Sequence, residues 1–129
     1  AVGTRFVLPP DTPEFPMSAS HLFDEDVVIT GLRARMNFRG KKMRFEVESP
    51  DGAIQNLLSV PAYNYGWQPH YLLNEPVRVS AGSTVHVIGA LDNSVSNPTN
   101  PDPSLEIKFG LNSWEEMFTG YFTYHPALD

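Results

Sequence analysis

The chain of 129 residues has the length of a single domain, and 41% of its residues are hydrophobic, which is typical of a globular protein rather than a disordered one. No apolar run approaches the ~20 residues of a transmembrane helix, and the net charge of −6 disfavours bulk attraction to nucleic acid or to an anionic membrane surface. The sequence contains no cysteine, which excludes disulfides, cysteine-bound zinc and thiol nucleophiles.

Twelve prolines and nine glycines divide the chain into short segments, which leaves little room for long helices. Residues 1–16 contain four prolines and are expected to form an irregular Pro-rich arm or edge segment. Segments rich in β-branched and aromatic residues predict strands. These segments are residues 5–8, 27–30, 32–39, 43–48, 77–79, 83–90 and 117–124.

Turn signals separate these segments. Ser49-Pro50-Asp51-Gly52 has a proline followed by Asp-Gly, and residues 80–83 include a glycine, so both indicate hairpins. About eight short strands at this spacing, with no internal repeat, predict an all-β fold, an antiparallel β-sandwich of the jelly-roll type. No internal boundary is visible, so residues 1–129 are expected to form one such domain.

One segment concentrates positive charge, because six of the nine basic residues fall between positions 33 and 44. An extended strand at residues 32–39 would share one face among the side chains of Arg33, Arg35, Asn37 and Arg39. Such a face is most simply solvated and balanced by acids on neighbouring strands. The alternative is a site for an anion.

Other polar and aromatic segments carry weaker signals. Tyr65 and Trp67 lie in an aromatic stretch that could form a ligand platform, although rings more often pack against a core. Residues 92–103 are rich in Asn and Asp and are expected to brace their own turns, with a calcium site as the alternative. The four histidines are scattered, and the chain has neither a Gly-x-Ser-x-Gly motif nor a glycine-rich phosphate loop.

Several separate motifs occur in an order that resembles the C-terminal domain of copper type II ascorbate-dependent monooxygenases. They are Arg35-Met36-Asn37-Phe38-Arg39-Gly40-Lys41, Leu57-Leu58-Ser59-Val60-Pro61, Tyr63-Asn64-Tyr65-Gly66-Trp67-Gln68, Asp92-Asn93-Ser94, Asn97-Pro98-Thr99-Asn100-Pro101-Asp102-Pro103 and Trp114-Glu115-Glu116-Met117. The likeness is to the bacterial relatives more than to peptidylglycine and dopamine hydroxylases, and it covers residues 5–125. It too implies a β-sandwich of the jelly-roll kind.

In that family this domain holds the copper that binds oxygen, through a His-x-His pair on one strand and a Met in a Glu-Met motif. Met117 matches the Met, but the His-x-His pair falls on Arg35 and Asn37. A guanidinium has no lone pair to donate, and an amide carbonyl is a poor copper ligand. A guanidinium ~4 Å from the ion would also add repulsion of about 4 kcal/mol per unit of copper charge at an effective dielectric of 20.

The departure predicts a degenerate metal site with no cofactor and no catalytic residue. We expect a non-catalytic binding or interaction module, as a subunit or appended domain of a larger assembly in the periplasm or outside the cell. We expect a protein partner, no nucleic acid, and membrane contact only through that partner. The expected binding residues are Arg33, Arg35, Asn37, Arg39, Tyr65, Trp67, Glu115, Glu116 and a vestigial Met117.

The charge of Arg35 is expected to replace that of the ion, by pairing with Glu115 or Glu116 or with an anionic group of a partner or ligand. The opposing hypothesis is a copper-dependent, ascorbate-using monooxygenase domain with a rearranged metal site, in which Met117 shares copper with His70 or His86. Two imidazole nitrogens near the Met117 sulfur would support that enzyme. A third hypothesis is a packing subunit without a ligand, which a large exposed apolar patch would favour.

Overall fold

The computed structural model describes residues 1–112 and 114–128, and these residues form ten strands and no helix. The strands are β1 (Val2–Gly3), β2 (Val7–Leu8), β3 (Thr12–Leu22), β4 (Val27–Met36), β5 (Gly40–Glu48), β6 (Ile54–Val60), β7 (Tyr71–Val79), β8 (Thr84–Asn93), β9 (Ile107–Lys108) and β10 (Phe118–Pro126). Every ladder between these strands is antiparallel. In the described part of the chain no helix is long and apolar enough to cross a membrane.

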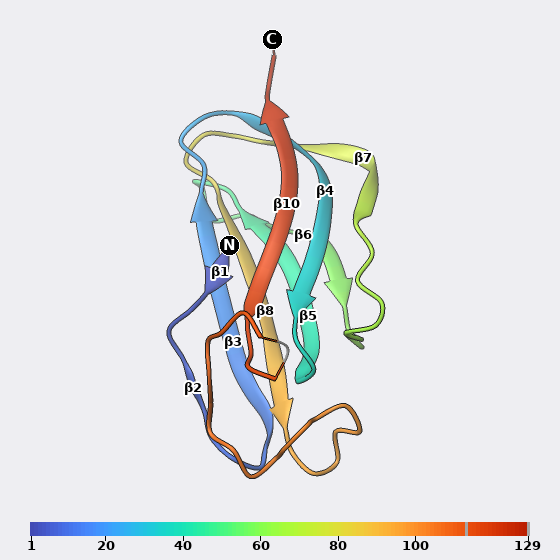
Figure 1. Cartoon of the computed structure of the whole chain (residues 1–129). Coiled ribbons are helices and arrows are strands. Elements are labelled where there is room, and N and C mark those ends of the chain that lie inside the picture. Colours follow the sequence, from blue (N-terminus) through green and yellow to red (C-terminus); the bar gives the residue numbers. More distant parts are fainter. Residues whose placement is uncertain (113, 129) are drawn as a thin grey trace.

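The strands build two four-stranded sheets, in the orders β1-β10-β4-β7 and β3-β8-β5-β6, and a small sheet of β2 and β9. Figure 1 shows β10 and β4 lying in front of β3, β8 and β5. Buried side chains from both four-stranded sheets belong to one hydrophobic cluster, with Leu32 and Phe118 on one side and Phe45 and Val87 on the other. The antiparallel β-sandwich predicted from the sequence is therefore confirmed.

The alternation of apolar and polar residues explains why these segments form strands with one buried face. In β5 the side chains of Met43, Phe45 and Val47 are buried, while the residues between them reach solvent. In β4 a register shift between Ile29 and Gly31 interrupts the alternation, and the strand then resumes with Leu32 facing the core. The pattern thus directs one face of each sheet into the shared core.

Both predicted turns form, but only one closes a hairpin. Gly52 adopts a φ of 91°, and its amide donates to the Ser49 carbonyl, so β5 and β6 form the expected hairpin. Gly82 adopts a φ of 86° in the turn at residues 80–83. That turn joins β7 of one sheet to β8 of the other, so the hairpin predicted there is wrong.

Two further expectations are corrected. Residues 1–16 do not form an irregular arm, because β1, β2 and the start of β3 lie in them, but the alternative of an edge segment is confirmed for the start of β3. Pro13 and Pro16 fit in β3 because this strand lies at a sheet edge and pairs only with β8, so a missing amide proton is tolerated. The strand predicted at 32–39 ends at Met36, and a turn follows it.

The two sheets approach closely at Gly120. A Cβ atom at this position would lie 2.7 Å from Phe45 Cε2 and 2.7 Å from Val87 Cγ2, in the facing sheet. Both neighbours are fully buried and cannot move outward. The distance between the sheets therefore depends on the absence of a side chain at this point of β10.

We expect Gly120→Ala to lower the free energy of unfolding by about 1–3 kcal/mol, because the added methyl overpacks the core. Denaturant unfolding of the two proteins measures this. Gly66→Ala adds the same methyl at an exposed turn and should leave stability nearly unchanged. Equal stabilities for the parent and Gly120→Ala would contradict the close approach of the sheets.

Candidate functional site

The site lies where β4 ends. Beyond Met36 the chain turns, and the Gly40 amide donates to the Asn37 carbonyl over 3.1 Å. Figure 1 shows this turn at the same end of the sandwich as the loop after β8 and the loop that leads into β10. Residues 37–40 are thereby brought to Glu115, Glu116 and Met117, which come from the far end of the sequence.

A buried carboxylate joins these segments. Glu116 is fully buried, and its Oε1 accepts the backbone N–H of Asn37 at 2.5 Å. Its Oε2 accepts the backbone N–H of Arg39 at 3.0 Å, and the Met117 N–H is 3.4 Å from Oε1. Burial raises the pKa of the Glu116 carboxyl to about 7, although the hydrogen bonds and the charge of Arg39 act in the opposite direction.

Arg39 is also fully buried, which corrects its predicted place on an exposed basic face. Its Nε donates to Asn93 Oδ1 over 3.1 Å, and its Nη1 donates to the Trp114 carbonyl over 2.9 Å. Its Nη2 is buried and has no hydrogen-bond partner among the described residues. Burial lowers the pKa of this guanidinium, against the opposing charges of Glu116 and Asp102.

The side chain of Asn37 is likewise buried, because the loop that precedes β10 covers it. Its Nδ2 donates to the carbonyls of Asn112 and Glu115, at 3.1 and 3.3 Å. Asn37 therefore holds the loop that precedes β10, and it lies on no solvated strand face. The Glu115 carboxylate accepts from the Asn112 side chain at 2.7 Å, inside the same loop.

Arg35 lies beside Met117. The guanidinium Nε donates to the Met117 sulfur over 3.3 Å, and Arg35 lies opposite Thr119 in the β4–β10 ladder. Within the described residues Arg35 forms no ion pair, because Glu116 is held by backbone amides and Glu115 by Asn112. The expected pairing of Arg35 with Glu115 or Glu116 is therefore wrong, and the anionic group of a partner or ligand remains as the alternative.

Arg33 lies two residues before Arg35 and therefore on the same outer face of β4. Its Cζ is 5.9 Å from the centroid of the Tyr121 ring, and its Nη2 is 3.4 Å from Gln68 Oε1. Its Nε is buried without a hydrogen-bond partner in the described part of the chain. Arg33 and Arg35 are thus the two residues of the predicted basic face that do lie on the outer surface of this sheet.

The predicted aromatic platform is divided. Tyr65 packs on Phe38, with ring centroids 4.5 Å apart, and so covers the turn after β4. Trp67 is 71% exposed, and its amide donates to the Asn64 carbonyl in a tight turn rather than in a strand.

The histidines of the enzyme hypothesis have other neighbours. His86 Nε2 is 2.9 Å from Glu48 Oε1 on the outer side of the β3-β8-β5-β6 sheet, between the buried Val85 and Val87. His70 Nε2 is 3.4 Å from Thr123 Oγ1, and about 20 Å of extended chain separates Thr123 from Met117. The described residues contain no group of three His, Asp or Glu side chains with metal-ligand geometry.

The donor set at the matched positions does not suit copper. The Arg35 guanidinium has no lone pair, the Asn37 amide is occupied by two carbonyls, and the Met117 sulfur accepts from Arg35. A cation at this sulfur would sit beside a fixed positive charge.

Sequence reasoning missed two residues that build the site. Tyr63 donates its hydroxyl to the Met36 carbonyl and accepts the Met36 amide, which pins the end of β4; burial raises the pKa of this tyrosine to about 12. Asn93 is fully buried and donates to the carbonyls of Pro9 and Leu105. Tyr63 and Asn93 both belong to motifs that were noted for their family resemblance. For Asn93, the Asn-rich sequence around it predicted only hydrogen bonds within its own loop.

That bracing is confirmed. Side-chain oxygens of Asp92, Asn97, Asn100 and Asp102 each accept a backbone N–H two residues ahead. The Asn100 side chain also donates to Asn93 Oδ1, the atom that receives Arg39. The loop therefore forms the outer support of the buried Arg39.

A comparison with models of known protein families finds no match to this chain, and a comparison with curated proteins finds no relative.

We expect the parent to lose stability relative to Glu116→Gln as the pH rises from about 4.5 to about 7. The folded protein holds the Glu116 proton more tightly than the unfolded chain does, so the protonated carboxyl stabilises the fold. This stabilisation is complete below about pH 4.5 and is lost as the pH passes about 7. The difference between the two pKa values corresponds to a change in the free energy of unfolding on the order of 3 kcal/mol. Denaturant unfolding at a series of pH values measures the difference between the two proteins.

The matched control is Glu75→Gln, which removes an exposed carboxylate from β7. Its stability should follow that of the parent across the same pH range. A constant difference between the parent and Glu116→Gln at every pH would contradict a buried, titrating Glu116.

Proposed function

We propose that this chain is a non-catalytic binding module derived from the oxygen-site domain of a copper type II ascorbate-dependent monooxygenase. Its lost metal site would then be an interaction surface, in a subunit or appended domain of a larger assembly in the periplasm or outside the cell. The observation that carries the proposal is the contact between Arg35 Nε and the Met117 sulfur, at 3.3 Å. At the three positions that correspond to copper ligands in that family, Arg35 and Met117 contact each other and Asn37 holds the loop before β10, so these residues are not arranged around an ion.

The order of the strands supports the descent from a jelly-roll domain. With the short β2 and β9 set aside, the strands pair as nested partners: β5 with β6, β4 with β7, β3 with β8, and β1 with β10. Such nesting arises when one long antiparallel ribbon folds across two sheets, as in an eight-stranded jelly roll. It also explains why the first and last strands are neighbours.

The charges on the outer face of β4 support an anionic partner group. Lys41, Lys42, Arg44 and Arg78 each have a carboxylate within 4.0 Å, whereas Arg33 and Arg35 have none among the described residues. Two neighbouring guanidinium groups without counter-charge are suited to a carboxylate or another planar anion. In a chain of net charge −6 they form a local exception.

The same face also offers apolar contact. Tyr121 lies against Arg33, and Tyr121 and Leu72 are 47% and 76% exposed. Leu72 lies opposite Gly31 on β4, so it borders this face. Exposed rings next to arginine are the composition of protein interfaces, which favours a protein partner with an acidic group.

The double variant Arg35→His, Asn37→His should bind copper at least about a hundredfold more tightly than the parent. It supplies two imidazoles beside Met117 and removes a repulsion of about 4 kcal/mol per unit of copper charge. Competition with a chromophoric chelator, for both cupric and cuprous ions, measures the affinities. If the double variant folds poorly, the single variant Arg35→His, which removes the charge and adds one imidazole, serves as the test.

The matched control is Arg33→His, which makes the same exchange on the same face, away from Met117. It should bind copper no better than the parent. Unchanged affinity in both Arg35 variants would show that the ligand positions are assigned wrongly, and tight stoichiometric copper in the parent would contradict a non-catalytic module.

A further inference from the structure

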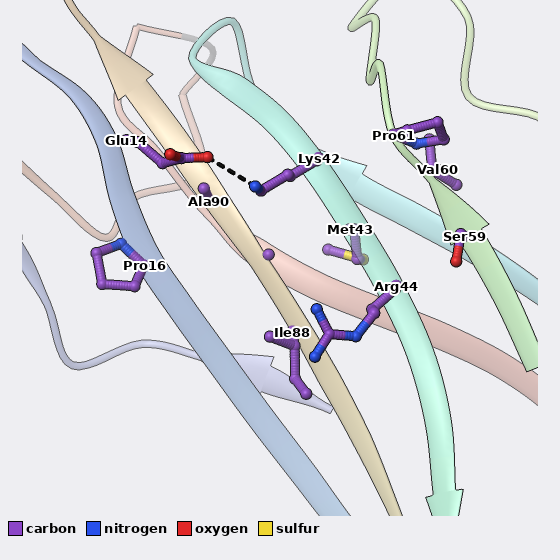
Figure 2. Close-up of a pocket in the computed structure, with 11 residues that line it drawn as sticks. Glu14, Pro16, Lys42, Met43, Arg44, Ser59, Val60, Pro61, Ile88 and Ala90 are labelled. Atoms are coloured by element: carbon purple, nitrogen blue, oxygen red, sulfur yellow. Dashed lines mark ion pairs between the residues drawn. The ribbon is translucent and has the colours of Figure 1, made fainter. Parts of the chain in front are cut away.

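The outer face of the other sheet carries a groove of about 510 Å³ that the proposed function does not use. It extends over β8 and β5, between β3 and β6, and Figure 2 shows the side chains that line it. A groove of this size is within the range that holds a small organic molecule. The core separates it from the face that carries Arg33 and Arg35.

The floor of the groove is apolar and low. Ala90 on β8 lies between Pro16 on β3 and Lys42 on β5, its partners in the two ladders. Ile88, two residues before Ala90 on β8, lies on the same face. Val60 and Pro61 form the opposite wall, at the end of β6. The small side chains between larger neighbours explain why this part of the sheet is hollow.

Cationic groups stand over this floor. Figure 2 shows the Lys42 ammonium extending toward Glu14 above Ala90, and the Arg44 guanidinium extending toward Ile88. Glu14 is shared by two lysines, at 2.7 Å from Lys42 Nζ and 3.7 Å from Lys41 Nζ. One carboxylate therefore balances two ammonium groups at this rim.

The guanidinium of Arg44 has one carboxylate nearby, but its two Nη groups remain available to a ligand. Only its Nε approaches a carboxylate, Glu46 Oε2, and the distance of 3.7 Å is too long for a hydrogen bond. Its two Nη atoms have no hydrogen-bond partner among the described residues. A planar fork with free donors matches a carboxylate, which it can bind through two parallel hydrogen bonds.

We propose that this groove binds a small monocarboxylate with an apolar body. Arg44 receives the carboxylate, with Lys42 adding positive charge, and the apolar body covers Pro16 and Ile88. The combination of two Nη groups without hydrogen-bond partners among the described residues and an apolar floor selects this class over a neutral or cationic amphiphile. The site is independent of Arg35 and Met117, because it lies on the opposite face of the sandwich.

The test compares three probes of one chain length, octanoate, octanol and octylammonium, by calorimetric titration and by the methyl resonances of Ile88. Octanoate should bind at one saturable site and shift the Ile88 resonances. Its affinity should be about tenfold higher than that of octanol, and octylammonium should bind more weakly than octanol. Arg44→Gln should weaken octanoate about tenfold without changing octanol. Ile88→Gln should weaken both.

Lys108→Gln removes one exposed positive charge away from the groove and should leave all three affinities unchanged. The site is refuted if octanoate shows no saturable binding, if the three head groups bind equally, or if the shifts appear at Trp67 and Leu72 instead. Circular dichroism confirms that each variant is folded. Should Arg44→Gln not fold, the order of the three probes on the parent decides the question.

Discussion

The structure at the end of the sandwich where β4 stops depends on one buried carboxylate. Glu116 reaches across from the start of β10 to the backbone amides of Asn37 and Arg39, and so fixes the turn that follows β4. An acceptor removed from water must find donors inside the protein, and backbone amides of a turn are rigid donors. The guanidinium of Arg39, held by Asn93 and Trp114, then supplies a compensating charge inside the same end of the fold.

This arrangement decides what the matched ligand positions can do. Because Glu116 is occupied by backbone amides, it cannot neutralise Arg35, and the Arg35 guanidinium turns to the Met117 sulfur. Asn37 is used to support the loop before β10. The outer face therefore keeps two arginines with no counter-charge from the described residues, beside the exposed ring of Tyr121.

Features determined by neighbouring residues were predictable from the sequence. The alternation in β5 and the Asp51-Gly52 turn predicted a strand and a hairpin, because local propensity and burial agree there. Features determined by residues far away in the sequence were not predictable. The end of β4 and the burial of Arg39 depend on Glu116, and the turn at residues 80–83 has the same local chemistry whether it joins strands of one sheet or of two. The edge position that admits Pro13 into β3 is likewise a property of the whole sheet.

The central proposal is that the charge of Arg35 takes the place of a metal ion at Met117, and elemental analysis of the protein purified without chelators tests it most directly. We predict a copper content far below one atom per chain, even after exposure to excess cupric or cuprous ion and gel filtration. One tightly held copper per chain, lost when Met117 is changed to leucine, would contradict it.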